Sequence, residues 1–115
     1  MRLKSDLWVA AYMRRCHIAG SFAGLRRRGA AEAGAIFIKI TRTDGSADLY
    51  GPAPQSEFDD ARPGDRAFVR LGKERPTSEE AVEKMLARQV DFDPDLWIVE
   101  VEDPQGRNFL DQVVP

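Results

Sequence analysis

"AIFIKITRTDGSADLY", residues 35–50, decides how this 115-residue chain folds. From position 36 to position 40 every second residue is isoleucine, so three branched side chains share one face of an extended segment. Asp44-Gly45 follows, and this dipeptide between alternating segments is a strong short-range signal for a hairpin turn. Residues 46–50 then return as a second strand. The stretch therefore predicts an antiparallel β-hairpin.

Two helices are expected, one on each side of this hairpin in the sequence. Good helix formers run from Asp6 to a terminating Gly20, and Ser5 is placed to act as the N-cap. The same residues also alternate passably as a strand, so helix and strand both stay open here. In the later segment Thr77 and Glu80 match a capping box, and apolar side chains then recur at helical spacing. This later helix has the clearer pattern of the two.

Alternating segments predict the remaining strands. Residues 21–28, 66–72 and 96–103 each have strand character, and the turn residues at 103–106 join the last of them to residues 107–114 as a second hairpin. The order of elements predicts an α+β fold. We expect a small single domain over residues 1–115, with an antiparallel or mixed sheet of about five strands in hairpins and two helices on one face.

A loop rich in proline and glycine spans about residues 51–64. Loops of this length are uncommon inside compact domains and are usually functional or mobile. We therefore expect a mobile loop here, and Phe58 within it is a candidate contact residue.

Composition excludes few classes of protein. Apolar residues make up 43% of the chain and charged residues 31%, which is ordinary for a globular domain. The sequence contains no apolar run long enough to span a membrane, and arginines interrupt the short apolar stretch near the N-terminus. The single cysteine, Cys16, has no partner within the chain for a disulfide bond. We expect a cytoplasmic protein.

Basic residues gather in the first quarter of the chain. Residues 1–29 carry seven Lys and Arg side chains and one Asp, a net charge of +6, whereas the remainder carries −8, which gives −2 overall. Forked hydrogen bonds from arginines suit phosphate oxygens, so the candidate anion-binding residues are Arg14, Arg15, Arg26, Arg27 and Arg28. No nucleic-acid-binding motif accompanies them. Solvated charge on an edge strand, which discourages aggregation, is the more ordinary use of the triplet.

Three alternate aspartates, Asp91, Asp93 and Asp95, imitate the start of a calcium-binding EF-hand loop, and Glu102 falls at its last ligand position. Leu96, however, replaces the glycine at the sharp bend of that loop, and the following residues have the pattern of a strand. The three aspartates are therefore kept only as a weak candidate metal site. A turn explains the segment better.

The turn interpretation assigns structural roles within "DFDPDLW", residues 91–97. Pro94 holds Asp93 in an extended conformation, and the Asp93 carboxylate can accept hydrogen bonds from backbone amides that follow it. Trp97 then begins the strand with its side chain in the core, on the more apolar face that it shares with Val99 and Val101. We predict a helix-to-strand junction at these residues.

The remaining ionisable residues do not assemble a catalytic pattern. Glu100 and Glu102 share one strand face and are expected to be exposed and paired with arginines. Cys16 and His17 are neighbours in a helical segment, so their side chains point about 100° apart and do not form a thiolate-imidazole pair. We expect no catalytic residue and no cofactor.

The segments "LRRRGAAEAGAIFIKI", "DGSADLYGPAP" and especially "FDPDLWIVEVEDPQGRNFLD" resemble a family of short bacterial proteins known as domain of unknown function 1491. The resemblance extends over nearly the whole chain. It implies a stand-alone bacterial protein, and it assigns no catalytic or binding residue to any position here.

We therefore expect a non-enzymatic protein-interaction or regulatory module, with self-association as one form of that role. Its contact surface would be a sheet edge or the loop around Phe58. The alternative is nucleic-acid or phosphate-ligand binding through the basic N-terminal quarter. A metal-dependent hydrolase centred on the three aspartates comes third.

Overall fold

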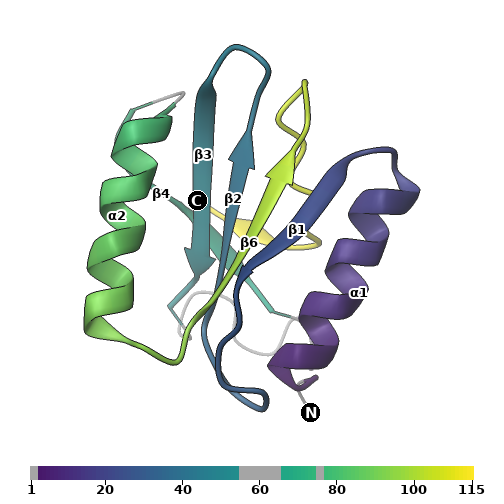
Figure 1. The fold of residues 1–115 in the computed structure, drawn as a ribbon, viewed down its shortest axis with the longest axis vertical. Coiled ribbons are helices and arrows are strands. Elements are labelled where there is room, and N and C mark those ends of the chain that lie inside the picture. The colour runs from purple at the N-terminus through teal and green to yellow at the C-terminus, as the bar shows by residue number, and fades with distance from the viewer. Residues whose placement is uncertain (1–2, 55–65, 75–76) are drawn as a thin grey trace.

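The computed structural model describes residues 3–54, 66–74 and 77–115. Within these ranges, two helices and seven strands form one domain (Figure 1). In chain order the elements are α1 (Ser5–Ile18), β1 (Phe22–Arg27), β2 (Ile36–Thr41), β3 (Ser46–Pro52), β4 (Phe68–Leu71), β5 (Thr77–Ser78), α2 (Glu79–Phe92), β6 (Trp97–Glu102) and β7 (Val113–Val114). The N-terminal segment, for which the sequence left both helix and strand open, is therefore a helix. The α+β class is confirmed.

The strands form one mixed sheet in the order β1-β6-β2-β3-β4-β7, with β5 paired to β3. The central pair, β2 and β6, is parallel, and Ile38 lies opposite Val99. The neighbouring pairs β1–β6, β2–β3 and β3–β4 are antiparallel. Within the described residues the sheet thus has seven strands instead of about five. β5, with two residues, is too short to show a sequence pattern, and β7 keeps only the last two residues of the strand expected over 107–114.

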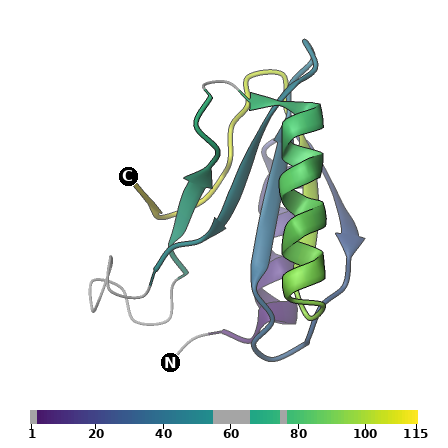
Figure 2. The ribbon, with the colours of Figure 1, turned by 90° about the vertical axis from the view of Figure 1, so that its left-hand side faces the viewer.

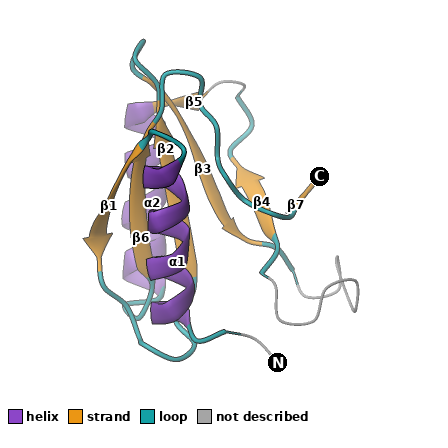
Figure 3. Cartoon of the chain, turned by 90° about the vertical axis from the view of Figure 1, so that its right-hand side faces the viewer, coloured by secondary structure: helices purple, strands orange, loops and turns teal. Residues whose placement is uncertain are grey.

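The expectation that both helices cover one face of the sheet is wrong. α1 packs against the face that carries Ile38 and Val99, whereas α2 packs against the opposite face, where Phe37 and Ile98 lie. Figure 2 shows α2 in front of the sheet, and Figure 3, from the other side, shows α1 in front. The physical reason is that the central strands are apolar on both faces, as parallel strands are when helices cover both sides.

The first hairpin is confirmed. Thr41 pairs with Ala47 in the antiparallel ladder, and Gly45 adopts a φ of 89° in the connecting turn. The prediction of a second hairpin, between residues 96–103 and 107–114, is wrong. Residues 107–112 are not a strand, and β7 pairs in parallel with β4. Both edges of β6 are already occupied by β1 and β2, so the chain that follows β6 finds no free edge there.

Both predicted helix caps are displaced. Lys4 occupies the N-cap position of α1, and the Ser5 hydroxyl instead donates a buried hydrogen bond to the Gly34 carbonyl at 2.7 Å. In α2 the cap is Ser78, whose hydroxyl accepts from the Ala81 amide. Thr77 cannot serve because β5 holds it opposite Ala47.

The predicted loop at about 51–64 starts later than expected. β3 continues through Pro52, and the Ala53 amide donates to the Ala67 carbonyl at 3.0 Å. Residues 55–65, with Phe58 among them, lie outside the described residues.

The junction between α2 and β6 is confirmed as a turn. α2 ends at Phe92, and the Asp93 carboxylate accepts from the Asp95 amide at 3.0 Å. Trp97 is 1% exposed, and its indole N–H donates to the Ala30 carbonyl at 2.8 Å. The Ala30 amide in turn donates to the Asp95 carbonyl at 2.8 Å, so the loop after β1 and this junction hold each other in place.

Candidate functional site

The outer face of α1 carries large apolar side chains that contact solvent. Leu7 is 54% exposed and Ile18 is 76% exposed, and Ala10 and Ala11 between them are also exposed. At 100° per residue, these positions and Arg14 fall within one sector of the helix. We call this sector the α1 stripe; it consists of Leu7, Ala10, Ala11, Arg14 and Ile18.

The opposite face of α1 fixes the helix to the sheet. Val9, Tyr12 and Cys16 are buried in the core between α1 and the sheet. The Tyr12 hydroxyl donates to the Asn108 carbonyl at 2.7 Å, and burial raises the pKa of Tyr12 well above its ordinary value. Burial likewise raises the pKa of the Cys16 thiol, so this side chain acts as a packed apolar group. The α1 stripe is therefore presented on a firmly anchored helix.

Polar contacts close both flanks of α1. Arg15 donates to the Phe109 carbonyl at 2.7 Å and lies 3.4 Å from the Asp111 carboxylate. On the other flank, His17 Nε2 lies 2.9 Å from the Ala23 carbonyl in β1. These contacts use polar groups beside the stripe and leave the stripe itself facing solvent.

Arg14 differs from the other candidate arginines. It is exposed, and it makes no hydrogen bond or ion pair with any residue in the described part of the chain. It is also the single charged member of the α1 stripe. An arginine surrounded by exposed leucine, isoleucine and alanine is placed to contact a partner through its charge and its aliphatic stem together.

The arginine triplet of β1 is engaged within the fold. Arg26 donates to Glu83 and Glu100, at 2.6 Å and 2.9 Å, and these bonds raise its pKa. Arg27 donates to the Pro94 carbonyl at 2.7 Å, and the Arg28 guanidinium lies over the Trp97 ring, 5.3 Å from its centroid. Of the five candidate anion-binding arginines, Arg14 therefore has no such contact with the residues that the structure describes, while the others contact carboxylates, carbonyls or a ring. Anion binding by them stays a prediction.

The free edge of β1 is modified in two ways. A register shift between Leu25 and Arg27 creates a bulge at Arg26, and charged side chains follow it. Bulges and charges on an edge strand both discourage the addition of another strand. The sheet edge is consequently a less suitable contact surface than the α1 stripe.

The three candidate metal ligands do not converge. Asp91 and Asp95 are exposed, and Asp93 uses its carboxylate in the turn described above. Within residues 3–54, 66–74 and 77–115, no group of three or more His, Cys, Asp or Glu side chains is placed to hold a metal ion. The sequence spacing therefore does not become a coordination geometry.

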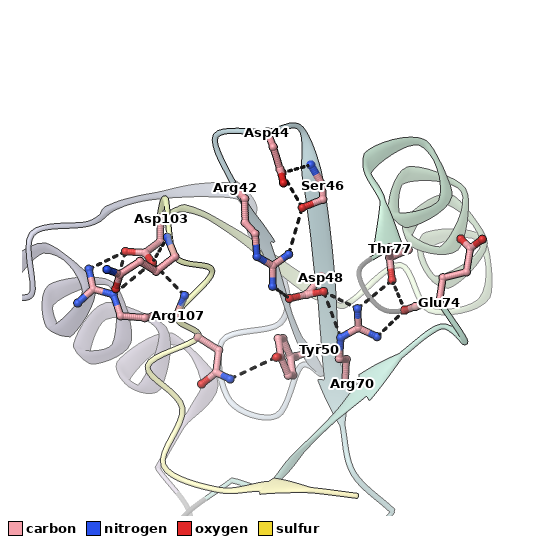
Figure 4. Close-up of polar contacts among 12 residues, drawn as sticks. Arg42, Asp44, Ser46, Asp48, Tyr50, Arg70, Glu74, Thr77, Asp103 and Arg107 are labelled. Carbon is pink, nitrogen blue, oxygen red and sulfur yellow. Dashed lines mark hydrogen bonds and ion pairs between the residues drawn. The ribbon is translucent and has the colours of Figure 1, made fainter.

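One buried polar cluster was not predicted from the sequence. Asp48 is 3% exposed, and its carboxylate accepts from Arg42 Nη2 at 2.5 Å and from Arg70 Nη2 at 2.5 Å (Figure 4). Arg70 also donates to the Thr77 hydroxyl at 3.1 Å. The cluster ties β3 to β4, to β5 and to the end of β2. The residues lie far apart in the sequence, and Asp48 resembles any polar residue of an alternating strand.

A second cluster surrounds Asp103, directly after β6. The Ser21 hydroxyl donates to its carboxylate, and Arg107 donates through both Nε and Nη2, the latter at 2.7 Å. These hydrogen bonds, chiefly those from Arg107, hold the pKa of Asp103 well below its ordinary value. The cluster secures the turn after β6 to the start of β1.

The third cluster joins α2 to the sheet. Lys39 is 3% exposed, and its ammonium group lies 2.9 Å from Glu79 and 2.6 Å from Glu83. Burial lowers the pKa of Lys39, but the hydrogen bonds with the two glutamates outweigh burial and raise it overall. The bonds from Arg26 and then from Lys39 lower the pKa of Glu83 to about 2. Glu100 pairs with Arg26, as expected from the sequence.

A partly open cavity of about 150 Å³, lined by both polar and apolar groups, lies beside the start of β4. Its lining is Ala33, Ala35, Ile36, Pro52, Arg66, Ala67 and Phe68. Ligand sites for small molecules usually measure about 300 to 1,000 Å³, so this cavity is small for such a site. Neither helix in the described part of the chain is long and apolar enough to cross a membrane.

Comparison with known proteins places the chain among relatives of similar size. The family model described as "Protein of unknown function (DUF1491)" matches residues 3–111. The crystal structure of a DUF1491 family protein from Caulobacter crescentus is 36% identical, with 100% of both chains covered and a TM-score of 0.82. The solution structure of a protein from A. tumefaciens is 40% identical, covers 100% of this chain and 98% of the other, and has a TM-score of 0.82. No curated protein matches.

Proposed function

We propose that this chain, which belongs to the DUF1491 family of unknown function, is a non-enzymatic protein-interaction module. The observation that carries the proposal is the α1 stripe, where exposed Leu7 and Ile18 lie on the same side of an anchored helix. Similar proteins come from C. crescentus and A. tumefaciens, which supports a bacterial setting for this interaction. A cytoplasmic location is part of the same proposal.

The energetics favour an interface over chance exposure. Complete burial of a leucine or isoleucine side chain contributes about 1.5 to 3 kcal/mol, so covering the exposed parts would contribute roughly half of that at Leu7 and roughly three quarters at Ile18. Scattered single apolar residues on a surface need no explanation, but contiguous ones mark contact sites. On this helix Leu7 adjoins Ala10 and Ala11, which allow a close approach, and Arg14 lies between these alanines and Ile18.

The buried charged residues also support the α1 stripe as the contact surface, because their own role is structural. Asp48, Asp103 and Lys39 are the buried charged side chains in the described part of the chain, and each is held by oppositely charged partners. The partners of Asp48 and Lys39 come from other elements, whereas Arg107 lies in the same turn as Asp103. Groups held in this way stabilise the fold. In contrast, no member of the α1 stripe belongs to the buried core of the described residues.

Site-specific photocrosslinking tests the proposal. The photoreactive residue p-benzoylphenylalanine would replace Leu7 or Ile18 in the chain expressed in C. crescentus, a bacterium that carries a relative. The matched control is the same replacement at Phe92, which is 89% exposed and lies at the end of α2. We expect discrete adducts from the two stripe positions and none from Phe92. Adducts of equal yield at all three positions, or adducts at none, would contradict the proposal.

A further inference from the structure

We propose that the partner of the α1 stripe is a second copy of this chain, with the two α1 helices packed antiparallel about a twofold axis between Ala10 and Ala11. The inference rests on the proposed function and specifies its partner. It follows from the self-complementary order of the stripe, from its charges and from the small residues at its centre.

The positions of the stripe, together with Leu3, are spaced symmetrically about the midpoint between Ala10 and Ala11. With the twofold axis between Ala10 and Ala11, each Leu7 lies opposite the partner's Arg14. Ile18 at the end of α1 lies opposite the partner's Leu3, an exposed residue just before the N-cap. Each apolar end of one helix therefore meets an apolar residue of the other, and the aliphatic stem of Arg14 covers Leu7.

Small residues occupy the centre of this arrangement. Ala10 and Ala11 are exposed and have no side chain beyond Cβ. Helices approach to about 8 Å between axes where the contact residues are small. The larger side chains stand on either side of the centre, since Leu7 and Arg14 are about 10 Å apart along the helix at 1.5 Å per residue.

Charge selects the antiparallel orientation. Arg14 has no ion pair within the described part of the chain, and Asp6 is the acidic residue of the first turn of α1. An antiparallel pair brings each Arg14 beside the partner's first helical turn, next to the partner's Asp6, so two ion pairs form across the interface. A parallel pair would instead place the two Arg14 side chains together. The helix dipoles also favour the antiparallel orientation.

Disulfide trapping tests the geometry. A cysteine at Ala11 lies next to the twofold axis, so two copies of Ala11→Cys come within the distance of a disulfide bond. The native Cys16 is fully buried and does not compete. The control is Lys84→Cys, at an exposed position in the middle of α2. We expect mild oxidation to give a covalent dimer from Ala11→Cys and monomer from Lys84→Cys; equal trapping of both, or of neither, would overturn the inference.

A charge exchange tests the orientation. Sedimentation equilibrium of the full chain would compare Arg14→Glu, Asp6→Lys and the double variant, with folding verified by circular dichroism. We expect each single change to weaken dimerisation about tenfold, which corresponds to about 1.4 kcal/mol, and the double variant to recover most of the loss. Because Asp6 also accepts a hydrogen bond from the Leu7 amide, recovery in the double variant is the decisive result. Additive losses would overturn the antiparallel pairing.

The outcomes separate this inference from the proposed function. A chain that stays monomeric at about 100 μM, a concentration that detects dissociation constants in that range, would overturn self-association. Photocrosslinks from Leu7 to a different protein would then still support the interaction module. A crosslinked species of twice the mass of the chain supports both conclusions together.

Discussion

Replacing Asp48 with asparagine tests whether the cluster in Figure 4 holds the strands together. Asparagine has nearly the same shape as aspartate, so packing is preserved and the change acts on charge and hydrogen bonding. The Asp48 carboxylate accepts from Arg42 through one oxygen and from Arg70, through Nε and Nη2, with the other. An amide can satisfy one of the two arginines, and its NH₂ group then faces the donors of the other.

The structure sets the size of the effect. Loss of one hydrogen bond to a charged group costs about 1.5 to 3 kcal/mol, and removal of one partner of a buried ion pair costs about 3 to 5 kcal/mol. The Arg42 and Arg70 side chains are 24% and 14% exposed, so solvent partly stabilises the unpaired charges. We therefore expect Asp48→Asn to lower the free energy of unfolding by about 3 kcal/mol, at the lower end of that range.

Urea unfolding at neutral pH, followed by circular dichroism, measures this loss. The matched control is Asp111→Asn, because that carboxylate is 55% exposed and lies 3.4 Å from Arg15; its loss should change stability by less than about 0.5 kcal/mol. Arg42→Gln should also cost less in the Asp48→Asn background than in the original chain. If Asp48→Asn unfolds within about 0.5 kcal/mol of the original chain, the cluster does not stabilise the strand ends.

Three further predictions concern the core, pH and backbone packing. Trp97→Ala should lower the free energy of unfolding by about 3 to 5 kcal/mol, while Asp91→Asn should leave it nearly unchanged; the reverse ranking in urea unfolding would restore the metal hypothesis. Because the pKa of Glu83 is lowered from 4.5 to about 2, its stabilisation is present above pH 4.5 and is lost as the pH falls toward 2. In an acid titration, the melting temperature of Glu83→Gln should therefore approach that of the original chain as the pH falls through that window. A difference in melting temperature that stays constant with pH would count against the ion pairs. Gly29→Ala should cost about 1 to 3 kcal/mol in urea unfolding, since a Cβ there meets the Asp95 carbonyl; an unchanged midpoint would show that the loop moves freely.

Local features of the fold were predictable from the sequence because their causes are local. The hairpin at residues 35–50 depends on alternation and on the Asp44-Gly45 turn, and both act between near neighbours. The turn at Asp93 and Pro94 has the same character. The caps were displaced by one residue because strand pairing and a distant carbonyl compete for Thr77 and Ser5.

The candidate site depended on knowing which side of α1 is buried. The sequence placed Arg14 among five arginines that could act together, whereas the fold engages the other four and leaves Arg14 within an apolar stripe. Leu7 and Ile18 are of residue types that usually lie in the core. Val9, Tyr12 and Cys16, on the opposite side of the helix, contact the sheet, so Leu7 and Ile18 face solvent.

The sequence by itself determined the α+β class, the first hairpin and the helix-to-strand junction, because each arises from side-chain periodicity or turn chemistry within a few residues. Only the tertiary structure decided that β2 and β6 pair in parallel, that the helices cover opposite faces, and that Asp48 meets two arginines. These features join segments separated by many residues, where the burial of both sheet faces and the pairing of charges select one arrangement from many that the local pattern allows.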